Sequence, residues 1–147
     1  MAQTWILVAD GARARVIECN ARNGVWNEVA CFDNPEGRLP GRSLTRDRPP
    51  RAAESVGSAR HAIEPHTTPR EKSAGNFARL LGDALARGLE ERRYEKLVLV
   101  APPRFLGALH EHIGAPLMQH VTGEVRRNLT TLPTAELRER LPSRLLH

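Results

Sequence analysis

The chain has 147 residues, of which 40% are hydrophobic, and these figures match one globular domain with a single core and exclude two full domains. Lys and Arg number 22 against 17 Asp and Glu, for a formal net charge of +5, and only Lys72 and Lys96 are lysines. The remaining basic residues are arginines, whose planar, bidentate donors suit carboxylates, phosphates and stacked bases.

The N-terminal apolar run, Trp5 to Ala9, is far shorter than a signal-peptide core or a membrane span. It therefore predicts a cytoplasmic protein with no membrane partner. Cys19 and Cys31 are too few for a disulfide scaffold and lack a metal-binding spacing, so we expect two buried free thiols.

Three short β-rich runs open the chain, and turn dipeptides separate them. The predicted strands are Thr4–Ala9, Arg13–Cys19 and Val25–Phe32, with turns at Asp10-Gly11 and Asn23-Gly24. Alternation along the second strand places Arg13, Arg15 and Ile17 on one face. An exposed edge strand in such a meander would offer a surface for a homodimer.

Residues 33–68 show neither helical nor strand periodicity, and prolines recur through them, which predicts a long irregular loop. Between Arg38 and Arg70 there are seven arginines against three acidic residues, so this part carries +4 of the net charge. Loops of this length within one domain are usually functional or disordered, and composition does not choose between the two.

A helix is predicted to start at Thr68-Pro69-Arg70-Glu71, where Thr68 can cap and Glu71 can close a capping box. Apolar residues then recur every three or four positions, which gives the helix one face that packs on a sheet. These residues are Ala74, Phe77, Ala78, Leu81, Leu85 and Leu89.

The apolar run Leu97–Ala101 is typical of a central strand covered on both faces. A helix from Pro103 to about Ile113 follows, residues 121–129 favour a strand over a helix, and Thr134 is expected to cap a short last helix that Pro142 ends. The order β-β-β-α-β-α-β-α predicts an α/β fold over residues 1–147, with one mixed five-stranded sheet and helices on its faces.

Two groups of residues have the chemistry of a binding site. Arginines of the second strand and of the loop would line an anion- or RNA-binding surface: Arg13, Arg15, Arg38, Arg42, Arg46, Arg48 and Arg51. The alternative is a solvated strand face. A polar cluster in the loop would form a pocket with the first turn: Asp10, Arg13, Arg15, Arg60, His61, Glu64 and His66.

The histidine spacing in this cluster is not a metal signature, so we favour hydrogen bonds that hold the loop to the helix start, and we expect no metal. No phosphate-binding glycine loop, nucleophile elbow or paired-carboxylate motif occurs, so no cofactor and no catalytic residue are predicted. Asp10 ends the first strand as in a metal nuclease, but the fourth strand ends without a carboxylate, which argues against that activity.

Four ordered blocks resemble the bacterial host-attachment protein family: Trp5–Arg15, Asn34–Arg38, Arg60–His66 and Leu97–Gly107. That family is named for a role in attachment of bacteria to host cells and is similar to bacterial relatives of the archaeo-eukaryotic release factors. The resemblance implies a ribonuclease H-like topology. The Gly-Gly-Gln tip by which release factors promote peptidyl-tRNA hydrolysis is absent here, so that activity is not carried over.

Three hypotheses of function follow. The first is a non-catalytic cytoplasmic protein that binds the ribosome or tRNA through the arginine-rich loop. The second is a factor that contributes indirectly to host-cell attachment. The third is a hydrolase that uses Asp10, Arg13, His61, Glu64 and His66, which requires the loop to fold over the end of the sheet.

Overall fold

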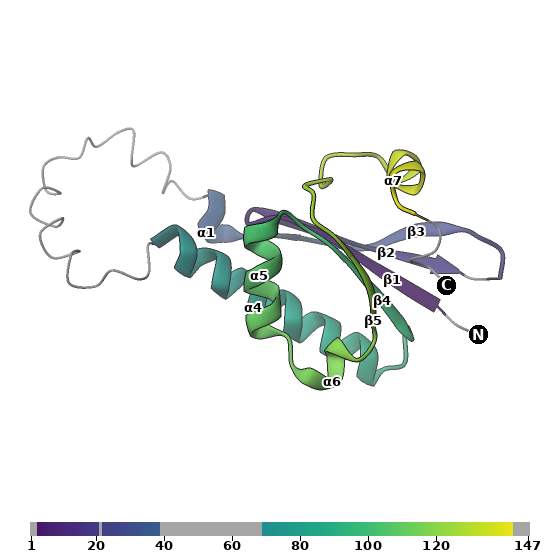
Figure 1. Cartoon of the computed structure of the whole chain (residues 1–147), viewed down its shortest axis with the longest axis horizontal. Helices are drawn as coiled ribbons and strands as arrows, with labels where there is room; N and C mark the ends of the chain where they lie inside the picture. The colour runs from purple at the N-terminus through teal and green to yellow at the C-terminus, as the bar shows by residue number, and fades with distance from the viewer. Residues whose placement is uncertain (1–2, 21, 39–68, 143–147) are drawn as a thin grey trace, which may run out of the picture.

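A five-stranded mixed sheet forms the centre of the protein (Figure 1). The computed structural model describes residues 3–20, 22–38 and 69–142. The strands are β1 (Gln3–Ala9), β2 (Arg13–Asn20), β3 (Trp26–Asp33), β4 (Lys96–Val100) and β5 (Val121–Val125), in the spatial order β3-β2-β1-β4-β5. This arrangement confirms the predicted α/β class with a mixed five-stranded sheet, and it is compatible with the ribonuclease H-like topology.

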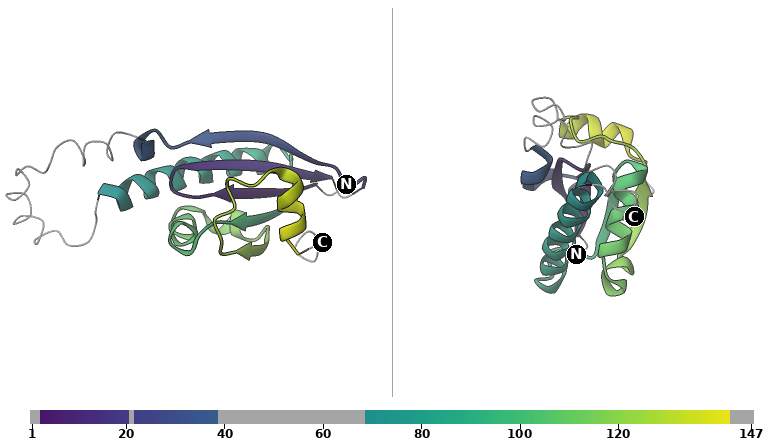
Figure 2. Two further views of the ribbon diagram at one scale, coloured as in Figure 1. Left: turned by 90° about the horizontal axis from the view of Figure 1, so that it is seen from above. Right: turned by 90° about the vertical axis from the view of Figure 1, so that its left-hand side faces the viewer.

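Helices cover both faces of the sheet (Figure 2). On one face lie α4 (Pro69–Glu90), α5 (Pro103–His112) and the short α6 (Ala115–Met118); on the other lies α7 (Thr134–Arg140), and α1 (Pro35–Arg38) follows β3. No helix in the described part of the chain is both long and apolar enough to cross a membrane.

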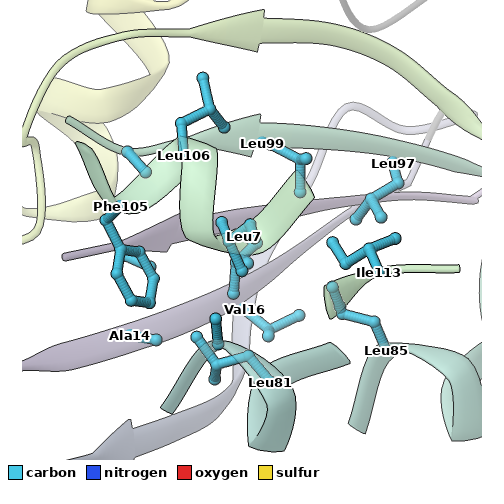
Figure 3. Packing of buried hydrophobic residues seen from close by; sticks show 14 of the residues in the cluster. Leu7, Ala14, Val16, Leu81, Leu85, Leu97, Leu99, Phe105, Leu106 and Ile113 are labelled. Carbon is cyan, nitrogen blue, oxygen red and sulfur yellow. The ribbon is translucent and has the colours of Figure 1, made fainter. Parts of the chain in front are cut away.

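The two central strands alternate their side chains between two apolar cores, because both of their faces are covered. Leu7, Leu97 and Leu99 pack towards α4 and α5, whereas Val8 and Val98 pack towards α7. Figure 3 shows the first core, in which Leu81 and Leu85 of α4 approach the sheet. The expectation that 97–101 is a fully buried strand is confirmed, since every residue from 97 to 101 is 0% exposed.

The predicted apolar face of α4 is also confirmed: Phe77, Ala78, Leu81 and Leu85 are buried, and Ala74 and Leu89 pack partly buried against the same core. Two glycines allow close approach on this face. A Cβ at Gly82 would lie 3.2 Å from the carbonyl oxygen of His112 on α5, and a Cβ at Gly88 would lie 2.7 Å from the Trp5 ring.

Three local predictions need correction. Residues 33–38 are not part of an irregular loop: Asp33 ends β3, and Pro35–Arg38 form α1, because the Asn34 side chain accepts a hydrogen bond from the Glu36 N–H at 3.0 Å and caps the helix. The rest of the predicted loop, 39–68, lies outside the described residues, as does the predicted cap Thr68.

Cys31, predicted to be buried, is exposed, because β3 is an edge strand with no buried residue. Cys19 is buried as expected, and both thiols are free. Thr134 is the first residue of α7 and not its cap; Pro133 occupies the cap position without a side-chain hydrogen bond.

Strand directions determine where loops gather. β2 is antiparallel to β1 and β3 is antiparallel to β2, while β4 and β5 run parallel to β1. The carboxyl ends of β1, β3, β4 and β5 therefore meet at one edge of the sheet, which we call the carboxyl edge. The described chain leaves this edge at Arg38 after α1, and α5 begins at the same edge after β4.

Candidate functional site

Asp10 joins two segments of the carboxyl edge that are far apart in sequence. Its Oδ1 accepts hydrogen bonds from the backbone N–H groups of Ala12 (2.8 Å) and Arg13 (2.9 Å), which closes the turn between β1 and β2. Its Oδ2 accepts hydrogen bonds from Asn128 Nδ2 (3.0 Å) and Thr130 Oγ1 (3.2 Å), in the segment that follows β5. Both carboxylate oxygens are thus occupied by protein donors.

Two opposing effects act on this carboxylate. Burial raises the pKa of Asp10, but the hydrogen bonds from Ala12, Arg13, Asn128 and Thr130 outweigh burial and bring the pKa below the ordinary value of 3.8. The group is therefore ionised at neutral pH and poorly suited to act as a general base, since its proton affinity is reduced. Its role in this geometry is to hold the edge together.

Arg15, on β2, ties the segment after β5 to the sheet. Its Nε donates to Glu28 Oε1 on β3 at 2.9 Å, and its Nη1 donates to the carbonyl oxygens of Thr130 (3.2 Å) and Leu132 (2.6 Å). The side chain is 12% exposed. The structure therefore brings Arg13 and Arg15 to one strand as expected, but it directs the donors of Arg15 to the protein itself and leaves Arg13 exposed.

Asn34 fixes the end of β3 to the same edge. Its Nδ2 donates to the carbonyl oxygen of Gly11 (2.9 Å) and to Ser73 Oγ on α4 (3.0 Å), and its backbone N–H donates to the carbonyl oxygen of Ala12 (2.9 Å). The residue is 2% exposed. The start of α4 and the end of β3, between which the undescribed residues 39–68 run, are therefore both held at the β1–β2 turn.

Four exposed arginines occupy this edge. Arg13 begins β2, Arg104 is the second residue of α5, and Arg126 and Arg127 follow β5 directly. None of them takes part in the ion pairs that the structure records between described side chains. In open sheets, ligands bind outside the carboxyl ends of parallel strands, so these guanidinium groups lie where such a fold places a binding site.

Sequence reasoning missed Arg104, Arg126 and Arg127. Their positions in the sequence could have indicated them. Arg104 lies shortly after β4, and Arg126 and Arg127 follow β5, so all three come after the carboxyl end of a strand. Arginine density is highest in the loop and therefore predicts a basic surface there, but density along the chain does not indicate which strand ends meet.

The remaining predicted residues are only partly located. Arg38 is the last residue of α1, and its side chain is not described. Arg42, Arg46, Arg48, Arg51, Arg60, His61, Glu64 and His66 lie outside the described residues. Within the described residues, no group of three or more His, Cys, Asp or Glu side chains has the arrangement of a metal site.

A further polar contact links α5 to β5. His110 Nε2 lies 2.5 Å from Glu124 Oε2, and both side chains are partly exposed. His120, after α6, contacts the carbonyl oxygen of Glu95 through Nδ1 at 2.9 Å. These two histidines therefore make contacts between elements at the surface.

One solved structure with similarity to this chain is that of the type II variant of the Ppx/GppA phosphatase of Aquifex aeolicus. The sequence identity is 10% and the TM-score is 0.42, over 85% of this chain and 35% of the phosphatase, so the chain spans about a third of the length of that protein. No curated protein matches the sequence.

The sequence family described as "protein required for attachment to host cells" matches residues 5–141. The match runs from β1 to the residue after α7, so it includes the whole carboxyl edge. The resemblance noted from four sequence blocks is confirmed at this level, and the chain belongs to the family of proteins required for attachment to host cells.

Proposed function

We propose that this protein binds RNA of the translation machinery, ribosomal RNA or tRNA, at the carboxyl edge of its sheet. The observation that carries the proposal is the group of exposed arginines, Arg13, Arg104, Arg126 and Arg127, on an edge that Asp10, Arg15 and Asn34 hold in place. Guanidinium groups bind phosphate oxygens in pairs of parallel hydrogen bonds, and a fixed scaffold lowers the entropy lost when they do so.

The arginines at this edge differ in their surroundings. Arg13 has Asp33 as its cross-strand neighbour, which offsets part of its charge. Arg104, Arg126 and Arg127 lie outside the strands, so we expect them to contribute most of the affinity. Arg38 ends α1, and Arg42, Arg46, Arg48 and Arg51 belong to the segment that follows it from the same edge; these arginines would extend the basic surface.

The resemblance to bacterial relatives of the release factors supports a partner in translation. The chain lacks the Gly-Gly-Gln sequence of the release factors, so the proposal is binding without hydrolysis of peptidyl-tRNA. We prefer binding to a hydrolase centred on Asp10, because four protein donors already occupy its carboxylate oxygens. Nothing in the proposal requires a cofactor.

The direct test is the anisotropy of fluorescently labelled tRNA titrated with protein at several salt concentrations. The triple variant Arg104→Gln, Arg126→Gln and Arg127→Gln should bind about tenfold or more weakly, with a shallower dependence of log K on log salt, because fewer counterions are released. The matched control removes the same charge from exposed arginines elsewhere: Arg22→Gln, Arg92→Gln and Arg140→Gln. Equal losses in both triple variants would contradict a localised site.

The contribution of the loop is separable. Replacing Arg42, Arg46, Arg48 and Arg51 together by Gln should weaken tRNA binding severalfold in the same titration, since each phosphate contact adds to the salt-dependent free energy. Unchanged binding would remove these arginines from the site and leave the carboxyl edge as the whole of it.

The family description favours a second function, a contribution to attachment of the bacterium to host cells. We propose that this contribution is indirect, through the RNA-binding activity. A membrane-impermeant biotin reagent applied to intact cells should leave the protein unlabelled, while deletion of its gene lowers attachment and the wild-type gene, but not the edge triple variant, restores it. Labelling on intact cells, or restoration by the variant, would contradict the indirect route.

A further inference from the structure

A groove runs along α4 above the outer part of the sheet. Two adjoining hollows of about 170 Å³ and 510 Å³ form it, and they share Phe32, Ala84 and Arg87 in their linings. The floor is apolar, with Val16 and Ala30 beside Phe32. The groove exists because α4 packs on the central strands, whereas β3 has no buried residue on either face.

One of the exposed apolar side chains lines this groove. The large hydrophobic residues that are exposed in the described chain are Val25 (42%), Val29 (39%) and Leu80 (46%). Val25 precedes β3, Val29 lies at the bulge of β3, and Leu80 of α4 lines the groove with Phe32. Leu80 and the apolar floor beside it form an exposed apolar surface of the kind that another molecule covers.

Four of the charged residues along the groove form a self-complementary pattern. Arg79, Asp83, Arg87 and Glu91 follow one another at intervals of four residues, alternate in sign and all line the groove. None of them takes part in the ion pairs recorded between described side chains. The remaining charged residue of the lining, Arg93, lies over the Trp5 ring, 5.7 Å from its centroid. We call the four residues from Arg79 to Glu91 the charge stripe. Read from Arg79 the signs are plus, minus, plus, minus, and read from Glu91 they are the opposite at every position, so the stripe is complementary to an antiparallel copy of itself.

We propose that a second copy of this chain binds in the groove, related to the first by a two-fold axis that passes between Asp83 and Arg87. In this arrangement Arg79 of each copy meets Glu91 of the other, and Asp83 meets Arg87. Leu80 of each α4 packs on the apolar floor around Phe32 of the other copy. A closed dimer of this kind uses the same patch twice and therefore requires self-complementarity, which this stripe has.

Charge inversion along the stripe tests the proposal by sedimentation equilibrium. The all-basic variant Asp83→Arg with Glu91→Arg and the all-acidic variant Arg79→Glu with Arg87→Glu should each be monomers, because like charges face one another. An equimolar mixture of the two should form a heterodimer. The wild type, and the variant that carries all four inversions, should both be dimers.

Like charges four residues apart also weaken a helix slightly, so circular dichroism must show that each variant is folded. The control Glu111→Arg with Glu139→Arg makes the same change of charge at exposed positions outside the groove and should stay a dimer. A wild type that is monomeric at about 200 μM, a dimer formed by either single-sign variant, or a mixture that stays monomeric would overturn the proposal.

Discussion

Asp10 and Arg15 are charged residues that stabilise the carboxyl edge through hydrogen bonds to the segment after β5. The sequence indicated that Asp10 ends the first strand and that Arg13 and Arg15 share a face, since both features follow from local spacing. It did not indicate that Arg15 donates to carbonyl groups more than a hundred positions further along the chain. Such contacts depend on the course of the chain between β5 and α7, which no local sequence pattern predicts.

Asp10→Asn should lower the free energy of unfolding at pH 7 by about 2 kcal/mol, because the amide presents a donor to Asn128 or to the turn N–H groups. The pKa of Asp10 is lower in the folded state than the ordinary 3.8, so its ionised form stabilises the fold above that pH. This contribution is lost as the pH falls below 3.8 through the folded-state pKa.

Urea unfolding of wild type and variant between pH 7 and pH 2 checks this expectation. The two stabilities should approach one another at the acid end, and Glu139→Gln, at an exposed position on α7, provides the control. A difference between Asp10→Asn and wild type that is constant over the whole pH range would show that ionised Asp10 is not what holds the turn.

Arg15→Lys should lower the free energy of unfolding by about 1–3 kcal/mol, because one ammonium group cannot reach Glu28 and both carbonyl groups at once. Its affinity for tRNA, measured at a temperature where the variant is folded, should equal that of the wild type. Weaker binding with unchanged stability would place Arg15 in the RNA site instead of the scaffold.

At the scale of elements, the periodicity of α4 predicted both the helix and its buried face, because a 3.6-residue repeat of apolar side chains is a local property. The roles of Gly82 and Gly88 were not predictable, since a glycine in a helix indicates close approach only once its neighbour is known. The exposure of Cys31 was missed for a similar reason: an edge strand and a central strand look alike until strand order is known.

Gly88→Ala should destabilise the protein by about 1–3 kcal/mol even though alanine favours helices, because the new methyl group would overlap the Trp5 ring. That ring has little room to move: it stacks on Tyr94 with centroids 4.6 Å apart, and the Tyr94 hydroxyl donates to the carbonyl oxygen of Leu85 at 2.6 Å. Thermal unfolding measures the change.

Gly107→Ala on α5 is the matched control, because no atom beyond its chain neighbours and the backbone of its own helix lies within 4 Å of its Cβ position. It should stabilise the protein by about 0.5–1 kcal/mol through helix propensity. If Gly88→Ala stabilised the protein to the same degree, the contact of α4 with Trp5 would be looser than the structure indicates.

At the scale of the whole molecule, the order of elements was sufficient to predict a mixed sheet, because parallel strands need helical crossovers and a meander does not. Strand order, and with it the meeting of four strand ends at one edge, required the structure. Arginines from the start of β2, from α5 and from the segment after β5 come to the same edge of the sheet only through that arrangement. The proposed function therefore rests on topology more than on arginine content.

Co-sedimentation of the purified protein with ribosomes, at about 50 and 200 mM salt, is the decisive test of RNA recognition by the carboxyl edge. We expect saturable binding that persists at the higher salt for the wild type and for the control Arg22→Gln, Arg92→Gln and Arg140→Gln. The variant Arg104→Gln, Arg126→Gln and Arg127→Gln should stay in the supernatant at that salt. Equal sedimentation of both triple variants, or loss of wild-type binding at 200 mM salt, would contradict RNA recognition by the carboxyl edge.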